Sequence, residues 1–234
     1  MRITGILVLV CALVLASSTT GSARLSADDP CIQSGETPVH IKTSDGVVVY
    51  GVEVGTGTTG VVLAHQYFSD HCEFMDFARE LGSVGYRALA IDFRCNGLST
   101  CGDSRHLDRD VAASVGQLRA DGATRIKLVG ASMGGTAVLI AASSIRPSVD
   151  GVVSLSGPAY FRGLDAAGAV RRSQVPVRFL VSKGDRRFAR DARYLMRAAA
   201  AKDKAIVRYA GRYHGSSILA LPNAKPYVLQ FLAR

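Results

Sequence analysis

The sequence predicts an α/β fold with a mostly parallel central sheet that is covered by helices on both faces. Short, continuous apolar runs alternate along the chain with longer segments whose apolar residues recur at helical spacing. The apolar runs lack the apolar–polar alternation of half-exposed strands, as expected for parallel strands buried on both faces. The chain has 234 residues and no visible repeat after residue 30, which fits a single domain.

The first expected strand covers residues 47–54 and follows the turn signal Ser44-Asp45-Gly46. A short apolar run at residues 60–65 indicates the next, fully buried strand. Residues 72–84 form the first expected helix, since their apolar residues fall on one helical face and a glycine ends the segment. A strand at residues 87–93 then completes a strand–helix–strand unit.

The middle of the chain continues the alternation. Residues 105–120 form an expected helix with four aliphatic residues along one face, and residues 125–129 form an apolar strand. A second helix, at residues 133–145, ends before Pro147, because proline cannot continue a helix. The next expected strand covers residues 149–155.

The last third of the chain supplies two strands and two helices. Strands are expected at residues 175–181 and 205–209, separated by an alanine-rich helix at residues 191–201. A closing helix is expected at residues 226–232. In sheets of this kind ligands bind beyond the carboxyl ends of the strands.

The charge distribution excludes a nucleic-acid-binding protein. The formal net charge is +9, but Lys and Arg are scattered from Arg79 to Arg234 instead of massed in one run. We interpret the excess as a source of solubility, with a mild attraction to anionic surfaces or substrates.

The N-terminus has the pattern of a secretory signal peptide over residues 1–27. A cationic start, Met1-Arg2, precedes an apolar run at residues 6–16 and then small and polar residues. Cleavage is expected after Ala23 or Ala27, which leaves residues 28–234 as the mature domain, secreted or in a periplasm-like oxidising compartment. The alternative is an uncleaved membrane anchor, which the apolar run of about 11 residues is short to form. We therefore expect no stable membrane anchor.

Removal of that segment leaves four cysteines, an even number that suggests disulfides in a secreted protein. Four cysteines allow three pairings, and the sequence alone leaves them open. The favoured pairing joins Cys95 to Cys101 across a Gly/Asn/Ser-rich loop and Cys31 to Cys72. No pair has the spacing of a structural zinc site, so no metal is expected.

The candidate nucleophile is Ser132, in Gly130-Ala131-Ser132-Met133-Gly134. Gly-x-Ser-x-Gly between an apolar strand and a helix predicts a sharp turn that exposes the serine oxygen above the sheet. The helix that follows favours negative charge at its N-terminus. A glycine turn carrying a serine without a function is the alternative, and the strand–helix context argues against it.

A serine hydroxyl needs a base to take its proton, and in this arrangement the order along the chain is serine, acid, histidine. Asp185 ends one late strand and His214 follows the next, so both are expected at the carboxyl edge of the sheet. Asp165 and Asp191 are the competing acids, the first far from its strand and the second expected to start a helix. The expected roles are nucleophile for Ser132, general base for His214 and orienting acid for Asp185, with no cofactor.

The tetrahedral intermediate needs backbone N–H donors for its oxyanion. One is expected from Met133, directly after the nucleophile, and the other from the loop after the strand at residues 60–65. In that loop Tyr67 is the first choice of donor and Gln66 the alternative. His65 is expected to satisfy neighbouring loop groups and not to take part in the reaction.

Together, His65-Gln66-Tyr67, Asp92-Phe93-Arg94, Gly130-x-Ser132-x-Gly134-Gly135, Gly184-Asp185 and Tyr213-His214-Gly215 resemble the motifs of the α/β-hydrolase superfamily. Within it, the chain is most similar to small lidless esterases, dienelactone-hydrolase-like proteins and serine aminopeptidase-like hydrolases, over about residues 39–234. Two departures are Gln66 and Cys95, at positions where the superfamily usually has glycine. The resemblance implies that Asp92 and Arg94 are structural loop residues.

Only about 18 residues separate the strand ending near Ser156 from the one starting at Val175, too few for a large cap domain. We therefore expect an open site, covered at most by residues 160–169, and hydrolysis of small or short-chain esters. A peptidase or amidase with the same triad is the alternative enzyme. A non-catalytic binding protein on the same scaffold is a third possibility. The sequence does not predict the oligomeric state.

Overall fold

The computed structural model describes residues 29–234, and residues 31–234 form one compact unit. The expected signal peptide, residues 1–27, lies outside the described residues. Within the described part of the chain, no helix has the length and apolar character needed to cross a membrane.

An eight-stranded sheet forms the centre of the unit, in the order β1-β2-β4-β3-β5-β6-β9-β10. Strand β2 is antiparallel to both β1 and β4, and all the other neighbours are parallel. The predicted mostly parallel sheet is thereby confirmed. The strands are β1 (Thr37–Lys42), β2 (Val48–Val54), β3 (Thr59–Ala64), β4 (Arg87–Ile91), β5 (Arg125–Ala131), β6 (Gly151–Leu155), β9 (Val177–Ser182) and β10 (Lys204–Tyr209).

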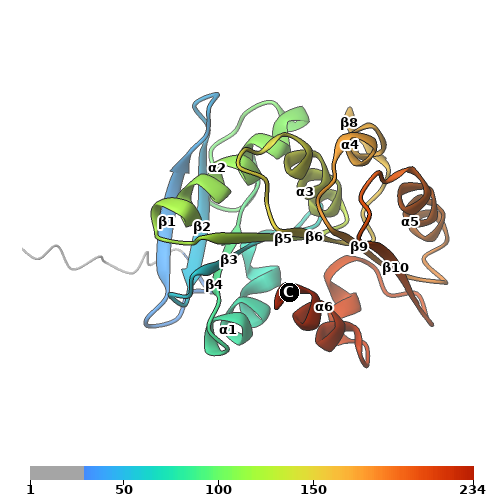
Figure 1. Cartoon of the computed structure of the whole chain (residues 1–234). Helices are drawn as coiled ribbons and strands as arrows, with labels where there is room; N and C mark the ends of the chain where they lie inside the picture. The colour runs from blue at the N-terminus through green and yellow to red at the C-terminus, as the bar shows by residue number, and fades with distance from the viewer. Residues whose placement is uncertain (1–28) are drawn as a thin grey trace, which may run out of the picture. The chain divides into compact units, whose positions relative to one another are not determined.

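Helices cover both faces of this sheet, as Figure 1 shows, with α2, α3, α4 and α5 on one side and α1 and α6 on the other. They are α1 (Met75–Ser83), α2 (Leu107–Ala120), α3 (Met133–Ser144), α4 (Ala166–Arg172), α5 (Arg186–Ala198) and α6 (Ala224–Leu232). Short 3₁₀ helices are η1 (His71–Phe74), η2 (Ser104–His106) and η3 (Gly215–Ala220).

Two hydrophobic clusters lie on opposite faces of the sheet. In β3, the fully buried Val62 belongs to the cluster under α2 to α5, while Val61 and Leu63 belong to the cluster under α1 and α6. Successive side chains of a strand point to opposite faces. Strands that contribute to both clusters are therefore apolar at most positions, which explains the apolar runs in the sequence.

The structure differs from the predicted elements in three places. Strand β1 was not predicted, because this partly exposed edge strand has polar residues that hide its period. A two-stranded hairpin, β7 (Tyr160–Phe161) and β8 (Leu164–Asp165), and helix α4 follow β6. Helix α5 begins at Arg186, five residues before the predicted start, because its first turn is rich in arginine and gave no apolar period.

The predicted absence of a large cap is confirmed. Only the β7–β8 hairpin and α4 lie between β6 and β9, and α4 packs against α3 and α5. The hairpin at Tyr160–Asp165 is therefore the one insertion between these strands that can cover the carboxyl edge of the sheet.

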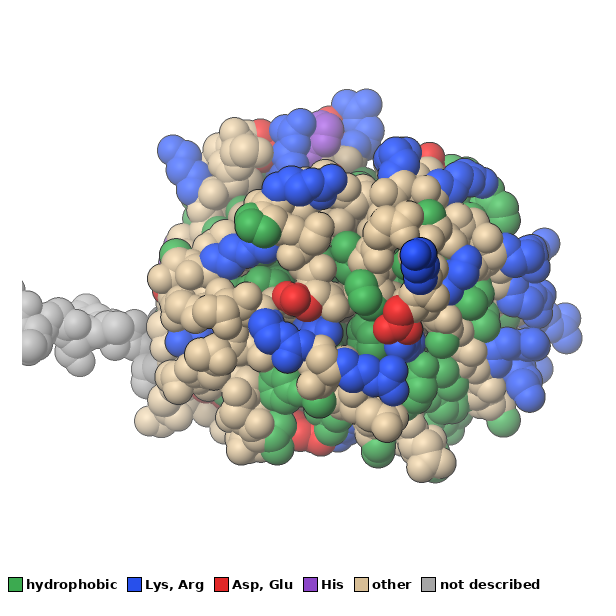
Figure 2. Space-filling model, in the orientation of Figure 1, with side chains coloured by type: hydrophobic (Ala, Val, Ile, Leu, Met, Phe, Trp, Pro, Cys, Tyr) green, Lys and Arg blue, Asp and Glu red, His purple; other side chains and the backbone are tan. Residues whose placement is uncertain are grey.

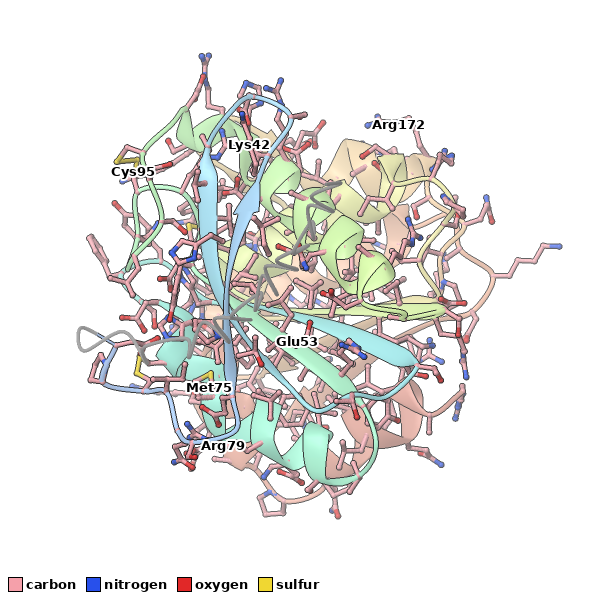
Figure 3. The ribbon with its side chains drawn as sticks, turned by 90° about the vertical axis from the view of Figure 1, so that its left-hand side faces the viewer. Lys42, Glu53, Met75, Arg79, Cys95 and Arg172 are labelled. Carbon is pink, nitrogen blue, oxygen red and sulfur yellow. A yellow bond between two sulfur atoms is a disulfide. The ribbon has the colours of Figure 1, made fainter. Side chains whose placement is uncertain are left out.

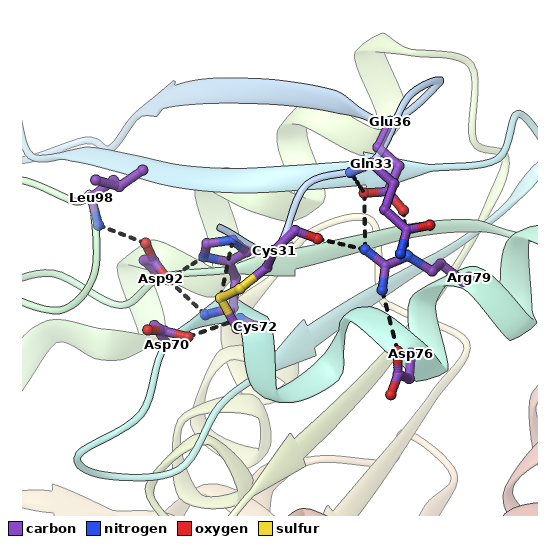
Figure 4. Close-up of a disulfide and its surroundings, with 10 residues drawn as sticks. Cys31, Gln33, Glu36, Asp70, Cys72, Asp76, Arg79, Asp92 and Leu98 are labelled. Carbon is purple, nitrogen blue, oxygen red and sulfur yellow. Dashed lines mark hydrogen bonds and ion pairs between the residues drawn. A yellow bond between two sulfur atoms is a disulfide. The ribbon is translucent and has the colours of Figure 1, made fainter. Parts of the chain in front are cut away.

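The structure has both disulfides that the sequence favoured, Cys31–Cys72 and Cys95–Cys101. Cys95 lies in the loop after β4, whereas Cys31–Cys72 fastens the start of the unit to η1 (Figures 3 and 4). Beside Cys31–Cys72, the Arg79 guanidinium donates to Glu36 Oε1 at 2.6 Å and to the Cys31 carbonyl oxygen at 2.5 Å (Figure 4). The segment before β1 is thus held to η1 by a covalent bond and to α1 by an ion pair.

The two disulfides should contribute unequally to stability, because they close loops of different length. Cys31 and Cys72 are 41 residues apart and Cys95 and Cys101 only 6. Loop-closure entropy predicts that replacing Cys31 and Cys72 together by serine lowers the free energy of unfolding by about 4 kcal/mol. The same change at Cys95 and Cys101 should cost about 2 kcal/mol. Urea denaturation of the two double variants measures both, and equal losses would contradict the prediction.

Candidate active site

Ser132 lies in a strained turn between β5 and α3. Its backbone has φ 46° and ψ −110°, a conformation that L-residues rarely adopt. The glycines around it are required by close backbone contacts. A Cβ atom at Gly130 would lie 2.3 Å from the Gly134 carbonyl oxygen, and one at Gly134 would lie 2.2 Å from the Ala64 carbonyl oxygen. The motif therefore forms the sharp strand-to-helix turn that the sequence predicts.

Asp185 and His214 lie just after β9 and β10, two parallel neighbours. The Nδ1 atom of His214 is 2.8 Å from Asp185 Oδ2, a hydrogen-bond distance. The Asp185 side chain is 13% exposed and that of His214 34%, so the pair is partly screened by protein while the imidazole reaches the surface. A carboxylate in this position orients the ring with its other nitrogen free to take a proton.

A pocket of about 260 Å³ is lined by Ser132 and by a residue that contacts this pair. Ser132 and Phe188 both line the pocket, and the Phe188 ring lies 4.2 Å from the His214 ring, centroid to centroid. In the described part of the chain, no hydrogen bond joins the Ser132 hydroxyl to His214. The fold thus brings the three sequence-predicted residues to the same edge of the sheet, at the ends of β5, β9 and β10.

Ser156 is a polar residue of this site that sequence reasoning missed. It follows β6, is 1% exposed and donates from its hydroxyl to Asp185 Oδ2 at 3.0 Å, the same oxygen that faces His214. The φ angle of Ser156 is 52°, so its backbone is strained like that of Ser132. Strain is retained where the surroundings demand it. One feature of the sequence could have identified Ser156. It lies just after a predicted strand, as Ser132 and Asp185 do.

We expect Ser156 to position Asp185. Replacing Ser156 by alanine removes one hydrogen bond to a charged carboxylate, a contact worth about 1.5–3 kcal/mol. If His214 is the base, kcat should fall about tenfold with KM unchanged, because the base is misoriented while the substrate pocket is intact. Steady-state kinetics on a small aryl ester tests this, with the thermal midpoint measured in parallel. A rise in KM with constant kcat would assign Ser156 to substrate binding.

The two competing acids have structural roles. Asp165 is the N-cap of α4 and accepts the Gly168 N–H at 2.7 Å. Asp191 lies inside α5 and accepts the Ala159 N–H at 3.4 Å, so the prediction that it starts a helix is wrong. Neither contacts His214 by a hydrogen bond in the described chain, and Asp185 alone has the geometry of the orienting acid.

The loop after β3 distinguishes between the two candidate oxyanion donors. The Gln66 N–H already donates to Glu73 Oε2 at 3.0 Å. Within the described residues the N–H groups of Tyr67 and Met133 have no acceptor, so both are available to an oxyanion. A Cβ atom on Gly215 would lie 2.2 Å from Gln66 Oε1, so the Gln66 side chain packs against the residue after His214. The side chain that replaces the usual glycine thus fills the space beneath the histidine loop.

His65 holds this loop in place through both ring nitrogens. Its Nε2 lies 3.0 Å from the Phe93 N–H, which donates to it, and its Nδ1 lies 2.6 Å from the Gln66 carbonyl oxygen. These partners assign the neutral ring with the proton on Nδ1. The side chain is fully buried, and burial lowers the pKa of His65 although the carboxylates of Asp92, Glu73 and Asp70 act in the opposite direction.

Stability should therefore fall as the pH drops below the ordinary histidine value. The folded state excludes a proton that the unfolded chain binds below about pH 6.5, so stability rises with pH in that window. Between pH 7.5 and 5.5 the free energy of unfolding should fall, because protonation of His65 is favoured in the unfolded chain over the folded one. Urea titrations at the two pH values measure the loss. A His65→Gln variant should lose this pH dependence and a variant of the half-buried His106, His106→Gln, should keep it. Equal slopes in both variants would contradict the assignment.

Asp92 and Arg94 anchor the loop after β4. Asp92 Oδ1 accepts from the backbone N–H of His71 at 2.7 Å and lies 2.9 Å from its Nδ1, and Asp92 Oδ2 accepts the Leu98 N–H (Figure 4). Arg94 is buried against Asp110. Atoms of Asp70, His71 and Asp92 lie within 4.8 Å of one another, a spacing that a metal could use, but Asp70 is occupied by the Cys72 N–H. Their contacts are those of a loop anchor.

Comparison with known proteins agrees with this geometry. The family model described as serine aminopeptidase, S33, matches residues 58–172, which include Ser132 but end before Asp185 and His214. No curated protein sequence matches the chain.

Solved structures with the same fold include three hydrolases. An esterase of Pyrococcus furiosus is 22% identical with a TM-score of 0.74, covering 85% of this chain and 92% of its own. An esterase from Exiguobacterium antarcticum is 14% identical with a TM-score of 0.70, and the match covers 85% of this chain and 100% of the esterase. A monoacylglycerol lipase of Paleococcus ferrophilus is 19% identical with a TM-score of 0.66, covering 79% and 98%. At these identities the likeness concerns the fold. With the sheet order and the strained serine turn, it shows that the chain has the α/β-hydrolase fold, which the family model matching residues 58–172 supports.

Proposed function

We propose that the protein is a serine hydrolase that cleaves ester bonds of small or short-chain substrates through an acyl-enzyme intermediate. Ser132 attacks the acyl carbonyl, and His214 accepts the serine proton and passes it to the leaving alcohol. Asp185 orients His214 and stabilises the imidazolium. The N–H groups of Met133 and Tyr67 bind the oxyanion of the tetrahedral intermediate. Water then hydrolyses the acyl-enzyme with His214 as the base.

The observation that carries the proposal is the 2.8 Å contact between Asp185 and His214 beside a pocket lined by Ser132. Three strand ends must meet for this arrangement, which supports a triad over a serine in a glycine turn. The free N–H groups of Tyr67 and Met133 supply the second requirement of acyl transfer.

The size of the site supports small substrates. The pocket at Ser132 has a volume of about 260 Å³, and the short β7–β8 hairpin replaces an apolar lid. We expect short acyl esters to be cleaved with a higher kcat/KM than long-chain triglycerides. A strong preference for the long chains in the same assay would argue against this substrate class.

The match to the serine aminopeptidase model favours a second candidate, a peptidase or amidase with the same triad. Parallel rates on aminoacyl anilides and on aryl esters of matched acyl groups separate the two. The ester proposal expects the aryl esters to react far faster relative to their uncatalysed rates.

The test of the mechanism is labelling by a fluorophosphonate, which reacts with an activated serine. We expect the wild-type chain to be labelled and the Ser132→Ala variant to remain unlabelled, with the modified peptide identified by mass spectrometry. Absence of labelling in the wild type would favour a non-catalytic binding protein on this scaffold.

We further infer that the protein is secreted after removal of residues 1–27. Two disulfides support an oxidising compartment. Mass spectrometry of the protein exported by an expressing host should find a new N-terminus at Arg24 or Asp28. An intact Met1 on membrane-bound protein would support the anchor instead.

A further inference from the structure

Two pockets, one lined by Ser132 and one by its neighbour Met133, share Phe161 and Arg162 of the β7–β8 hairpin. The first, of about 260 Å³, is lined by Ser132, Pro158, Tyr160, Phe161, Arg162, Arg187 and Phe188. The second, of about 380 Å³, includes Tyr67 and Met133, the two expected oxyanion donors, and also Phe161 and Arg162. Phe161 and Arg162 border both spaces, so Arg162 lies at the pocket of Ser132 and at that of the expected oxyanion donors.

Arg162 occupies a backbone position that is unfavourable for arginine. Arg162 and Gly163 form the two-residue turn of the hairpin with φ values of 45° and 90°, and turns with two positive φ values favour Asn-Gly. A residue with a side chain other than Asn or Asp costs about 1–2 kcal/mol in that conformation. The guanidinium carbon lies 4.5 Å from the centroid of the Tyr67 ring, stacked over the oxyanion loop. The turn itself therefore does not favour arginine at this position. The contact with the Tyr67 ring holds the Arg162 cation at the pocket.

Arg187 brings a second cation to the same pocket from the first turn of α5. Arg186 and Arg187 begin this helix, where the helix dipole disfavours positive charge. Helix α5 carries five arginines and one aspartate, and Figure 2 shows Lys and Arg gathered on the side of the molecule where α5 lies in Figure 1. Neither the hairpin turn nor the start of the helix is stabilised by these positive charges, so local structure does not explain their presence at this end of the site.

Neither cation is neutralised by the protein. Over residues 29–234, no Asp or Glu lines either pocket, and the guanidinium groups of Arg162 and Arg187 form no ion pair. The remaining walls are aromatic, from Tyr67, Tyr160, Phe161 and Phe188. Unpaired guanidinium groups above a reactive serine fit a planar anion, since each can donate two parallel hydrogen bonds to a carboxylate.

We propose that the substrates of this site are esters that carry a free carboxylate, held by Arg162 and Arg187, on a flat or apolar body that packs against the aromatic walls. This inference rests on the proposed ester hydrolysis and specifies its substrate class. Both arginines are solvent-exposed, so their attraction for the carboxylate should weaken as salt rises. A neutral ester should lack that salt dependence.

The experiment compares esters that differ only in whether a carboxylate is free or methylated. One pair, the mono-4-nitrophenyl ester of adipic acid and its methyl ester, places the charge on the acyl side. The other pair, 4-acetoxybenzoate and its methyl ester, places it on the leaving group. The quantity measured is the ratio of kcat/KM for the charged ester to that for the neutral ester in the wild type, Arg162→Gln and Arg187→Gln. Arg193→Gln, an exposed arginine of α5 outside both pockets, is the matched control for net charge.

In at least one pair we expect the ratio to fall about tenfold in Arg162→Gln and in Arg187→Gln, the size expected for one lost charge-assisted contact. Arg193→Gln should keep the wild-type ratio, and 0.5 M salt should lower the ratio in the wild type. Ratios that stay at the wild-type value in both pocket variants would overturn the carboxylate proposal while leaving ester hydrolysis intact. An equal fall in Arg193→Gln would overturn it in favour of a general effect of net charge. Failure to hydrolyse even the neutral esters would instead contradict the proposed function.

Discussion

Replacing Ser132 by alanine should lower kcat for a small aryl ester by a factor on the order of 10⁴ to 10⁶. In the proposed mechanism the hydroxyl oxygen forms the acyl-enzyme, and no other serine lines the 260 Å³ pocket among residues 29–234. The substitution removes little packing, because it deletes one oxygen atom from a residue that is 9% exposed. Steady-state kinetics measures the loss, and circular dichroism measures the fold.

A matched control lies on α3, the helix that begins directly after Ser132. Ser143 also makes a local contact, donating to the Ile140 carbonyl oxygen at 2.7 Å, but lies outside both pockets. Ser143→Ala should therefore keep wild-type kcat within a factor of about two. Retention of most of the esterase activity by Ser132→Ala would remove Ser132 as the nucleophile and direct attention to another group.

Replacing Arg94 by methionine should lower the free energy of unfolding by about 3–5 kcal/mol. Arg94 is 1% exposed and donates to Asp110 from Nε and Nη2, the latter at 2.7 Å, and to Asp45 from Nη1 at 2.8 Å. Burial alone would lower the pKa of Arg94, but these hydrogen bonds outweigh it and raise the pKa. Asp110 is fully buried, so methionine would leave its carboxylate with only the backbone N–H of residue 94 and the helix N-terminus as partners.

Denaturant titration measures this loss, which is a large share of the 5–15 kcal/mol that stabilises a typical domain. The exposed pair Arg105–Asp103 offers the comparison, since its side chains are 69% and 39% exposed. Arg105→Met should leave the midpoint almost unchanged, because exposed ion pairs contribute little. Similar losses in the two variants would show that the burial of Arg94 is not what makes its ion pair important.

The interior of the fold was predictable because each central strand is buried on both faces. Such strands are apolar at most positions, with exceptions such as the buried Lys127 in β5 and Arg178 in β9, and this marks them without knowledge of their neighbours. Strand β1 and the β7–β8 hairpin could not be predicted in this way. Strand β1 is a partly exposed edge strand, and the two-residue strands of the hairpin are too short to show a period. The start of α5 was misplaced because Arg186 and Arg187 contradict the usual preference of helix starts for acidic residues.

The sequence by itself determined the order of the elements, the serine turn and the candidate triad, because these depend on local pattern and on order along the chain. The meeting of Asp185 with His214 depends on the pairing of β9 with β10, which only the tertiary structure decides. The same holds for the hydrogen bond of Ser156 to Asp185 and for the position of Arg162 at the pocket of Ser132. Each of these contacts joins residues that are distant in the sequence. A local sequence pattern cannot reveal such a contact, because it forms only when the chain folds.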